Sequence, residues 1–462
     1  MAENRMLNQV KSKWVDNGHV LLFTLLLFVF AAYTIFLSLN LKPGLIPDES
    51  YHFAISKHFA TTWGIPNNVP EAQSAGKSLQ QNSFLGYWIY GRVLTVFYSV
   101  SPIAADRQAL VILRIVNAMF SWGTVIATYL ISKEVIKNKW LQLLPVFMLT
   151  NTLMFVFLSA GVNYDNPAIL FCSLSLLFFI KALLHKNFVT NSLAWWIFIC
   201  IACLIKYTIL PLTFFMSVLW IIFIFKESPE VSLTSLYNKK NIPLALLLLA
   251  LIGANFCIYG INLIRYRSII PACTDVYSEE ICVVNTFAIR HQEMALPEKL
   301  TLKEAFRQGN PEPIRYVFDF WLRAMLDRIF GIMGHEIYFP ISVSYFLMML
   351  FWSIGLGMRY IQKPDFLFTS ILTIIIAYAL VLIRMNYNSE LVYGFNTAVA
   401  LQGRYIFPVI TIAYALWGYI MENVTNKRVR FVSIFFLIAL FLYGGPIRFI
   451  WYYNSVFADW FI

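Results

Sequence analysis

Long apolar runs recur along this chain and alternate with shorter polar stretches. A helix of roughly 20 apolar residues crosses the hydrocarbon core of a bilayer, and most of the runs reach that length. The pattern predicts about eleven spans, near residues 20–40, 110–132, 140–160, 167–184, 191–206, 208–225, 241–261, 338–358, 366–384, 404–421 and 431–447. We therefore expect an all-α, polytopic transmembrane protein with a single integral membrane domain over residues 1–462.

Two polar segments between the spans are long, over residues 41–108 and 262–337. Each contains an aromatic stretch with polar residues among the apolar ones, at 84–98 and 314–330. Such stretches are typical of amphipathic helices that lie in the interface plane. We expect one interfacial helix in each segment.

Composition agrees with a membrane protein, because 59% of the residues are hydrophobic and only 13% are charged. The net charge of +11 would suggest a nucleic-acid partner in a soluble chain. Here the short loops on one side of the predicted membrane are all net basic, which follows the positive-inside rule. We expect a cytoplasmic N-terminus, both long segments outside, and no nucleic-acid partner. The first span has no small-residue cleavage site after it, so it is predicted to stay as an anchor.

Six cysteines divide into two groups. Those in predicted spans, Cys172, Cys200, Cys203 and Cys257, are best explained as buried apolar residues. Cys273 and Cys282 both fall in the second long segment. Because a disulfide persists outside the cytoplasm, we predict a bridge between these two.

Two adjacent carboxylates, Asp48 and Glu49, directly follow the first predicted span. One interpretation is structural: Asp48 caps the next helix and Glu49 stabilises its first turn. The other is catalytic, because an oriented, ionised carboxylate can take a proton from a hydroxyl nucleophile. Both interpretations place the carboxylate of Asp48 at the membrane surface, and the sequence does not decide between them.

Further charged residues are predicted on the same face. Asp165 stands in a very short outer loop, where it either caps a helix or joins Asp48 in a shared site. Lys77 follows Asp48 in the same segment, Arg384 ends one span and Arg404 begins another. Arginines at span ends often only extend to the interface. They also suit a lipid phosphate, so these three cations are candidate phosphate ligands.

Metal and cofactor signals are weak. The outer histidines, His52, His58, His291 and His335, do not show the spacing of a zinc site. A divalent cation between Asp48 and Asp165 is the one cofactor that the residues leave open. No Walker loop or Rossmann fingerprint is present, so the sequence offers no cytosolic nucleotide site.

An acidic pair in the first outer loop of a chain dominated by spans resembles the GT-C glycosyltransferases. That superfamily includes protein O-mannosyltransferases and the aminoarabinose transferases of lipid A. Within it, Pro47–Glu49 followed by His52–Phe53, together with Gly403–Tyr405 before a span that contains Pro408, is similar to bacterial membrane proteins of the GT-C type. A Trp-Trp-Asp signature is absent, so transfer to asparagine is not expected.

The resemblance implies a GT-C fold and a polyprenyl-phosphate sugar as donor, because nucleotide sugars are absent outside the cytoplasmic membrane. The acceptor would be a cell-envelope glycan or lipid. By the same resemblance Asp48 would be the base of an inverting transfer, beside Glu49, and Asp165 the second carboxylate of the site. Lys77 would contact the donor phosphate, and Arg404 would help to stabilise it. The implied location is the bacterial inner membrane, with the site outside.

Two other functions stay open from the sequence. A transporter of lipid-linked glycans would use the same carboxylates and arginines to hold its cargo. An envelope-polysaccharide polymerase would share the large outer loops but would not need an early Asp-Glu pair.

Overall fold

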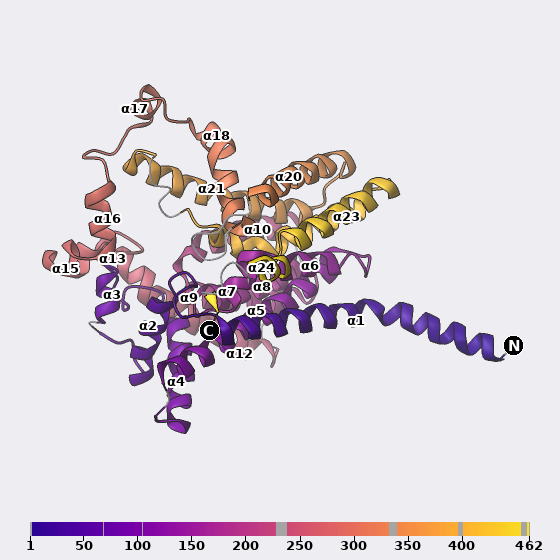
Figure 1. The fold of residues 1–462 in the computed structure, drawn as a ribbon, viewed down its shortest axis with the longest axis horizontal. Helices are drawn as coiled ribbons and strands as arrows, with labels where there is room; N and C mark the ends of the chain where they lie inside the picture. The colour runs from indigo at the N-terminus through magenta and orange to yellow at the C-terminus, as the bar shows by residue number, and fades with distance from the viewer. Residues whose placement is uncertain are drawn as a thin grey trace.

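A computed structural model shows that the chain is built from helices (Figure 1). It describes residues 2–67, 69–103, 105–227, 238–331, 340–395, 401–453 and 460–461. The β-type pairing found within those ranges is one isolated bridge between Leu41 and Phe461. The predicted all-α class is confirmed.

Within the described residues, nine helical stretches are long and apolar enough to cross a membrane, and the protein is a multi-pass membrane protein. These stretches are α1 (Ala2–Asn40, from Gly18 on), α5 (Asp106–Val135), α8 (Asp165–Leu183), α9 (Phe188–Ile205), η1 with α10 (Tyr207–Ile209 and Leu210–Glu227), α12 with η2 and α13 (Asn241–Asn255, Phe256–Gly260 and Ile261–Tyr266), α21 (Phe366–Tyr393), η5 with α22 (Gly403–Val409 and Ile410–Asn423), and α23 (Lys427–Tyr443) continuing toward α24 (Pro446–Tyr453).

Two predicted spans differ from this set. The span predicted over 140–160 is two short helices, α6 (Leu143–Thr150) and α7 (Leu153–Ser159), separated at Asn151. The side-chain amide of Asn151 donates to the Phe147 carbonyl at 2.9 Å, so it satisfies a backbone acceptor at the end of α6. The span predicted over 338–358 corresponds to α20 (Pro340–Tyr360), which begins beside residues outside the described part. The total of eleven spans stays a prediction.

Both long polar segments fold into short helices. The first contains α2 (Glu49–Thr61), α3 (Pro70–Ser74) and α4 (Leu85–Val100). The second contains α14 (Cys273–Val276), α15 (Glu279–Val283), α16 (Thr286–Met294), α17 (Leu302–Arg307), α18 (Pro313–Arg315), η3 (Tyr316–Trp321), α19 (Leu322–Leu326) and η4 (Asp327–Gly331). The helices predicted at 84–98 and 314–330 are therefore α4 and the run from α18 to η4.

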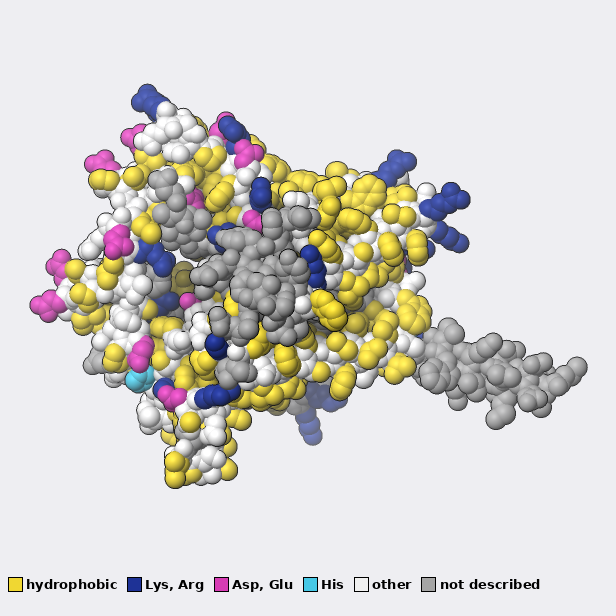
Figure 2. Space-filling view, viewed as in Figure 1, with side chains coloured by type: hydrophobic (Ala, Val, Ile, Leu, Met, Phe, Trp, Pro, Cys, Tyr) yellow, Lys and Arg dark blue, Asp and Glu magenta, His cyan; other side chains and the backbone are white. Residues whose placement is uncertain are grey.

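The elements of both polar segments gather at one end of the molecule. In Figure 1, α2, α3, α15 and α16 lie on the left, while the N-terminal part of α1 extends away on the right. α15 also packs against α3, so the two segments touch. Figure 2 shows a broad band of hydrophobic side chains between this end, where acidic and basic side chains mix, and the right-hand edge, where basic ones project.

Helix α8 is held firmly in the interior. It packs against α5 on one side and α9 on the other. The buried ring of Trp195 on α9 meets Phe179 of α8 edge-on, with ring centroids 5.5 Å apart. Edge-to-face aromatic pairs add to the stability that burial provides. The packing against α5 and α9 therefore holds α8, which begins at Asp165, in the interior.

Candidate active site

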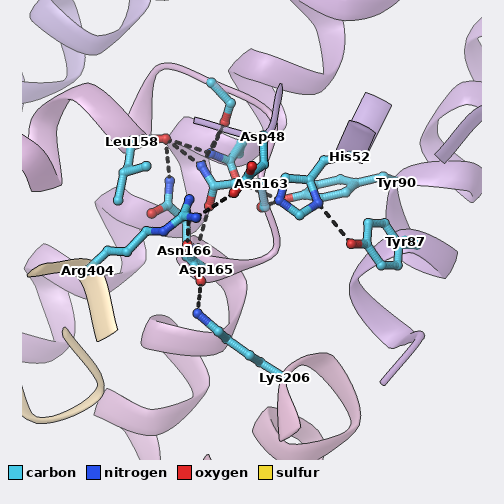
Figure 3. Close-up of polar contacts among 12 residues, drawn as sticks. Asp48, His52, Tyr87, Tyr90, Leu158, Asn163, Asp165, Asn166, Lys206 and Arg404 are labelled. Carbon is cyan, nitrogen blue, oxygen red and sulfur yellow. Dashed lines mark hydrogen bonds and ion pairs between the residues drawn. The ribbon is translucent and has the colours of Figure 1, made fainter. Parts of the chain in front are cut away.

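Four charged side chains from distant parts of the sequence meet at the end of the helices where the polar segments lie. They are Asp48, from the link between α1 and α2; Asp165, the first residue of α8; Lys206, after α9; and Arg404, in η5 (Figure 3). Each stands where a membrane-crossing stretch begins or ends. Alternating helix directions therefore bring them to the same side.

Asp48 has an unusual backbone conformation. Its φ of 61° lies in the left-handed region, where Asp and Asn are enriched among non-glycine residues. Asp48 stands before the first turn of α2 and makes no side-chain cap there, and its carboxylate accepts a hydrogen bond from Nη2 of Arg404. The side chain is 53% exposed. The predicted cap is thus wrong in its side-chain contact, and the carboxylate faces both Arg404 and solvent.

Asp165 is the buried member of the carboxylate pair. Its side chain is only 4% exposed. Nζ of Lys206 donates to Oδ1, and Nη1 of Arg404 lies 3.6 Å from Oδ2. Two cations thus lie against one buried carboxylate, and a buried charge needs such partners.

Arg404 bridges the two carboxylates through its two terminal nitrogens. Its neighbour Gly403 approaches the η4 backbone so closely that a β-carbon would lie 2.7 Å from the carbonyl carbon of Arg328. Glycine is therefore required for Arg404 to reach this depth. Among the described residues, the buried Nε and Nη1 of Arg404 have no hydrogen-bond partner. The guanidinium thus keeps donors for an additional oxygen ligand.

Lys77 lies close to this cluster. Its Nζ is 5.8 Å from the ring centroid of Tyr51. Burial lowers the pKa of Lys77, Asp48 acts against that shift, and the nearby charges of Lys206 and Arg404 reinforce it. Lys77 is thus close enough to feel all three charges, and an anion beside it would favour its protonated form.

Glu49 points away from its neighbour Asp48. Its side chain is 1% exposed, and Arg114 binds it through two hydrogen bonds, Nε to Oε1 at 2.7 Å and Nη2 to Oε2 at 2.6 Å. The backbone N–H groups of Gly44 and Val162 also donate to this carboxylate, at 3.1 and 3.2 Å. The predicted catalytic role of Glu49 needs revision, since these contacts fasten the loop that carries Asp48.

A network of amides shapes the turn before Asp165. The side chains of Asn117, Asn163 and Asn166 all donate to the carbonyl of Leu158, at 3.1, 2.8 and 3.0 Å. Figure 3 labels Leu158, Asn163 and Asn166. All three asparagine side chains are buried. Because buried polar groups are stable only when they are paired, this network fixes one conformation of the turn.

His52 packs beside the cluster. Its Nδ1 lies 2.9 Å from the hydroxyl of Tyr87, and its ring is 4.6 Å from that of Tyr164. Burial lowers the pKa of His52 to about 3, so the imidazole is neutral near pH 7. It therefore serves the site as a neutral hydrogen-bonding group.

Three of the predicted site residues meet in this cluster, and a fourth lies close to it. The structure brings Asp48, Asp165 and Arg404 together, and Lys77 lies beside them. Arg384 is exposed on α21, and no contact among the described residues joins it to this cluster. Its predicted role in binding phosphate therefore has no support in the geometry.

Metal ligation by Asp48 and Asp165 also stays a prediction. Both carboxylates are paired with cations here. The described residues contain no cluster of three or more His, Cys, Asp or Glu side chains that could hold a metal ion. In the second polar segment, the sulfurs of Cys273 and Cys282 are joined as a disulfide.

Two site residues were missed from the sequence. Lys206 and Arg114 are single basic residues at the end of one apolar run and inside another. Such an intramembrane charge is itself a sign of a function or of a buried partner, and in both cases the partner is a carboxylate.

Comparisons with known proteins give likenesses in fold only. No protein-family model matches the chain, and no curated protein matches it. One similar solved structure is ArnT from Cupriavidus metallidurans bound to undecaprenyl phosphate, at 12% identity and a TM-score of 0.49, over 90% of this chain and 62% of that one. Another is the oligosaccharyltransferase AglB from Archaeoglobus fulgidus in complex with an inhibitory peptide and a dolichol-phosphate, at 12% identity and a TM-score of 0.48, over 94% and 57%.

A further structure of the Archaeoglobus fulgidus oligosaccharyltransferase, in complex with Zn and sulfate, is similar at 13% identity and a TM-score of 0.48, over 91% of this chain and 53% of that one. The chain thus spans between about half and two thirds of the length of these proteins. At such low identities and TM-scores these likenesses assign no function to the chain.

Proposed function

We propose that this protein is a glycosyltransferase that moves a sugar from a polyprenyl-phosphate donor to a hydroxyl group of a cell-envelope glycan or lipid. One observation carries the proposal. The half-exposed carboxylate of Asp48 lies beside the cations of Arg404 and Lys77, at the end of the helices where the polar segments lie. A base and an anion-binding group side by side are what this reaction needs.

The balance of charge favours an anionic ligand. Asp48 and Asp165 face three basic side chains, Lys77, Lys206 and Arg404, so the cluster carries one surplus positive charge when Lys77 is protonated. The buried ion pair of Glu49 and Arg114 is neutral and adds no net charge. A lipid phosphate brings negative charge to this depth, and a guanidinium binds phosphate oxygens in bidentate fashion.

The proposed reaction is a single displacement at the anomeric carbon. The acceptor oxygen attacks the anomeric carbon of the donor sugar while Asp48 takes its proton. The bond between that carbon and the phosphate oxygen breaks, and polyprenyl phosphate leaves with both bonding electrons. Lys77 and Arg404 stabilise the developing phosphate charge. A single displacement of this kind inverts the anomeric configuration.

In this scheme Arg404 interacts with both Asp48 and the donor phosphate. A carboxylate paired with a guanidinium is a weak base, because the positive charge favours its ionised form. In the structure Arg404 donates to Asp48. A donor phosphate bound at Nε and Nη1 would offset the positive charge of the guanidinium, and Asp48 would then become a stronger base.

The proposed location is the bacterial inner membrane, with a cytoplasmic N-terminus and an extracytoplasmic site. The basic edge in Figure 2, away from the polar segments, supports this orientation through the positive-inside rule. Helix α4 and the run from α18 to η4 would then lie along the outer surface, where the lipid donor approaches.

The test is transfer by the purified protein in lipid bilayers that contain labelled polyprenyl-phosphate sugars and candidate acceptor lipids. We expect Asp48→Asn to lower turnover by at least 100-fold while donor affinity persists. Asp319→Asn is a matched control, because Asp319 is also half-exposed, at 58%, and also pairs with an arginine. Its turnover should equal that of the wild type.

Other outcomes point elsewhere. Translocation of the lipid-linked sugar without a new glycosidic bond would identify a transporter. A ladder of growing products would identify a polymerase. Full turnover in Asp48→Asn would remove this carboxylate from the chemistry.

A further inference from the structure

A polar cavity lies between the two long polar segments, and its lining includes the residues that follow Lys77. Its volume is about 400 Å³, within the range of small-molecule sites. Its polar walls are the side chains of Asn67, Ser78, Gln80, Gln81, Tyr266 and Tyr277. We name these six residues the amide pocket.

The amide pocket is held together by contacts across the two segments. The side-chain amide of Asn262 donates to the Gln81 carbonyl at 2.8 Å, and the hydroxyl of Tyr277 donates to the Lys77 carbonyl at 3.5 Å. The disulfide of Cys273 and Cys282 closes the loop that carries Tyr277. The walls therefore keep their spacing without a ligand.

The chemistry of the amide pocket is neutral. Among the described residues that line it, none is charged. Gln80 donates to the side-chain oxygen of Asn67, and Ser78 donates to that of Gln81. An amide has two N–H donors and two acceptor lone pairs, so each of these bonds uses only part of its capacity.

Two half-buried tyrosine rings, of Tyr266 and Tyr277, complete the walls. An aromatic face packs against apolar C–H surface, and amides pair with hydroxyl groups. An uncharged sugar presents both kinds of surface. A charged sugar would find no counter-charge on these walls, and burying its charge there would be costly.

The position of Lys77 links the amide pocket to the charged cluster. Lys77 precedes Ser78, Gln80 and Gln81 in one short stretch. Lys77 itself lines a second, smaller cavity, and the buried Leu79 lines both cavities. Ser78, which lines the amide pocket, directly follows Lys77, and consecutive Cα atoms lie about 3.8 Å apart. A phosphate at Lys77 would therefore have its sugar within reach of the amide pocket.

We infer that the amide pocket binds the uncharged sugar of the lipid-linked donor while Lys77 holds its phosphate. This inference rests on the proposed function and adds the class of sugar. A sugar of the acceptor would present the same hydroxyl and C–H surfaces. The amide pocket lies next to the phosphate ligand Lys77, however, and this position favours the sugar of the donor.

The experiment is equilibrium binding to the full-length protein in bilayer nanodiscs, with no acceptor present. The probes are bare polyprenyl phosphate and the same lipid bearing glucose, mannose, galactose, an amino sugar or a uronic acid. At least one uncharged sugar should raise affinity about tenfold over the bare lipid, as a few net hydrogen bonds allow. The variants Gln80→Ala with Gln81→Ala, and Tyr277→Ala, should lose that increment and keep the affinity for the bare lipid.

Gln308→Ala is the matched control, because Gln308 is an exposed glutamine at the end of α17, outside the pocket. It should keep the full increment. Retained affinity for the bare lipid shows that a variant is folded. The inference is overturned if no uncharged sugar adds affinity, if charged sugars bind better, or if the pocket variants weaken both lipids equally.

A second arm separates the two sources of sugar. Methyl glycosides are titrated onto protein that is already saturated with bare polyprenyl phosphate. If they bind in the pocket while the glycosylated lipid gains nothing, the pocket serves the acceptor and the donor assignment is wrong. Because binding is measured without transfer, tight binding of a glycosylated lipid by a chain with no turnover would overturn the proposed function alone.

Discussion

Substitution of the two adjacent carboxylates should separate stability from turnover. Glu49 is buried and bound to Arg114, whereas Asp48 is half-exposed. We expect Glu49→Gln to destabilise the fold and Asp48→Asn to stop transfer while the fold persists. The two changes are chemically alike, so the difference reports the environment of each residue.

The magnitudes follow from burial. In Glu49→Gln the guanidinium of Arg114, which is 1% exposed, loses its counter-charge. Removing one partner of a buried ion pair costs about 3–5 kcal/mol, because a charge is left buried and uncompensated. In Asp48→Asn the lost pair is partly solvated and Arg404 keeps Asp165 nearby, so the cost is about 1 kcal/mol or less.

The assay is the free energy of unfolding in mixed micelles, followed by tryptophan fluorescence, together with transfer in bilayers. Glu49→Gln combined with Arg114→Gln should be less destabilised than the sum of the single variants, because no charge then stays buried alone. A Glu49→Gln protein that is as stable as the wild type but inactive would refute the reasoning and return Glu49 to the chemistry.

Four further outcomes are expected. Burial lowers the pKa of His52 to about 3, so the unfolded chain, with a pKa of about 6.5, binds the extra proton in the window between these values. Stability should therefore fall with decreasing pH in that window, by about 1.4 kcal/mol per pH unit from this residue, and His52→Gln should remove that part of the slope. Lys206→Met should cost about 3–5 kcal/mol in unfolding free energy, because its buried carboxylate partner loses a cation; equal stability would contradict the ion pair. Replacing Cys273 and Cys282 by serine should lower stability by about 2–3 kcal/mol, and two thiols that alkylate without reductant in the native protein would rule the bridge out. Arg384→Ala should leave donor affinity unchanged in the nanodisc assay, and a tenfold loss would place this exposed side chain in the phosphate site.

The features that the sequence predicted well are those that depend on local pattern. Helices form at the apolar runs of membrane-crossing length and at the aromatic stretch 84–98. Each of these predictions needs only the residues of the segment itself. The break in the predicted span 140–160 falls at Asn151, whose side chain bonds to a backbone carbonyl in the middle of an apolar run. Hydrophobic periodicity does not register such a contact.

The candidate site was only partly predictable, because it is assembled from distant segments. Asp48, Asp165 and Arg404 could be assigned to one face from the alternation of the spans. Which residue pairs with which depends on packing, and Lys206 was missed although a single lysine at the end of an apolar run is a strong signal. The role of Glu49 also depended on Arg114, which is 65 residues away in sequence.

The left-handed backbone at position 48 explains how neighbouring carboxylates acquire opposite environments. With φ at 61°, Asp48 stands outside α2 while Glu49 begins it, and the two side chains leave the chain toward different partners. Asp tolerates this conformation, and a β-branched residue would be strained there by roughly 1–3 kcal/mol. Asn keeps the conformational tolerance and removes the charge. The Asp48→Asn variant therefore isolates the carboxylate chemistry, whereas Asp48→Val would mix it with backbone strain.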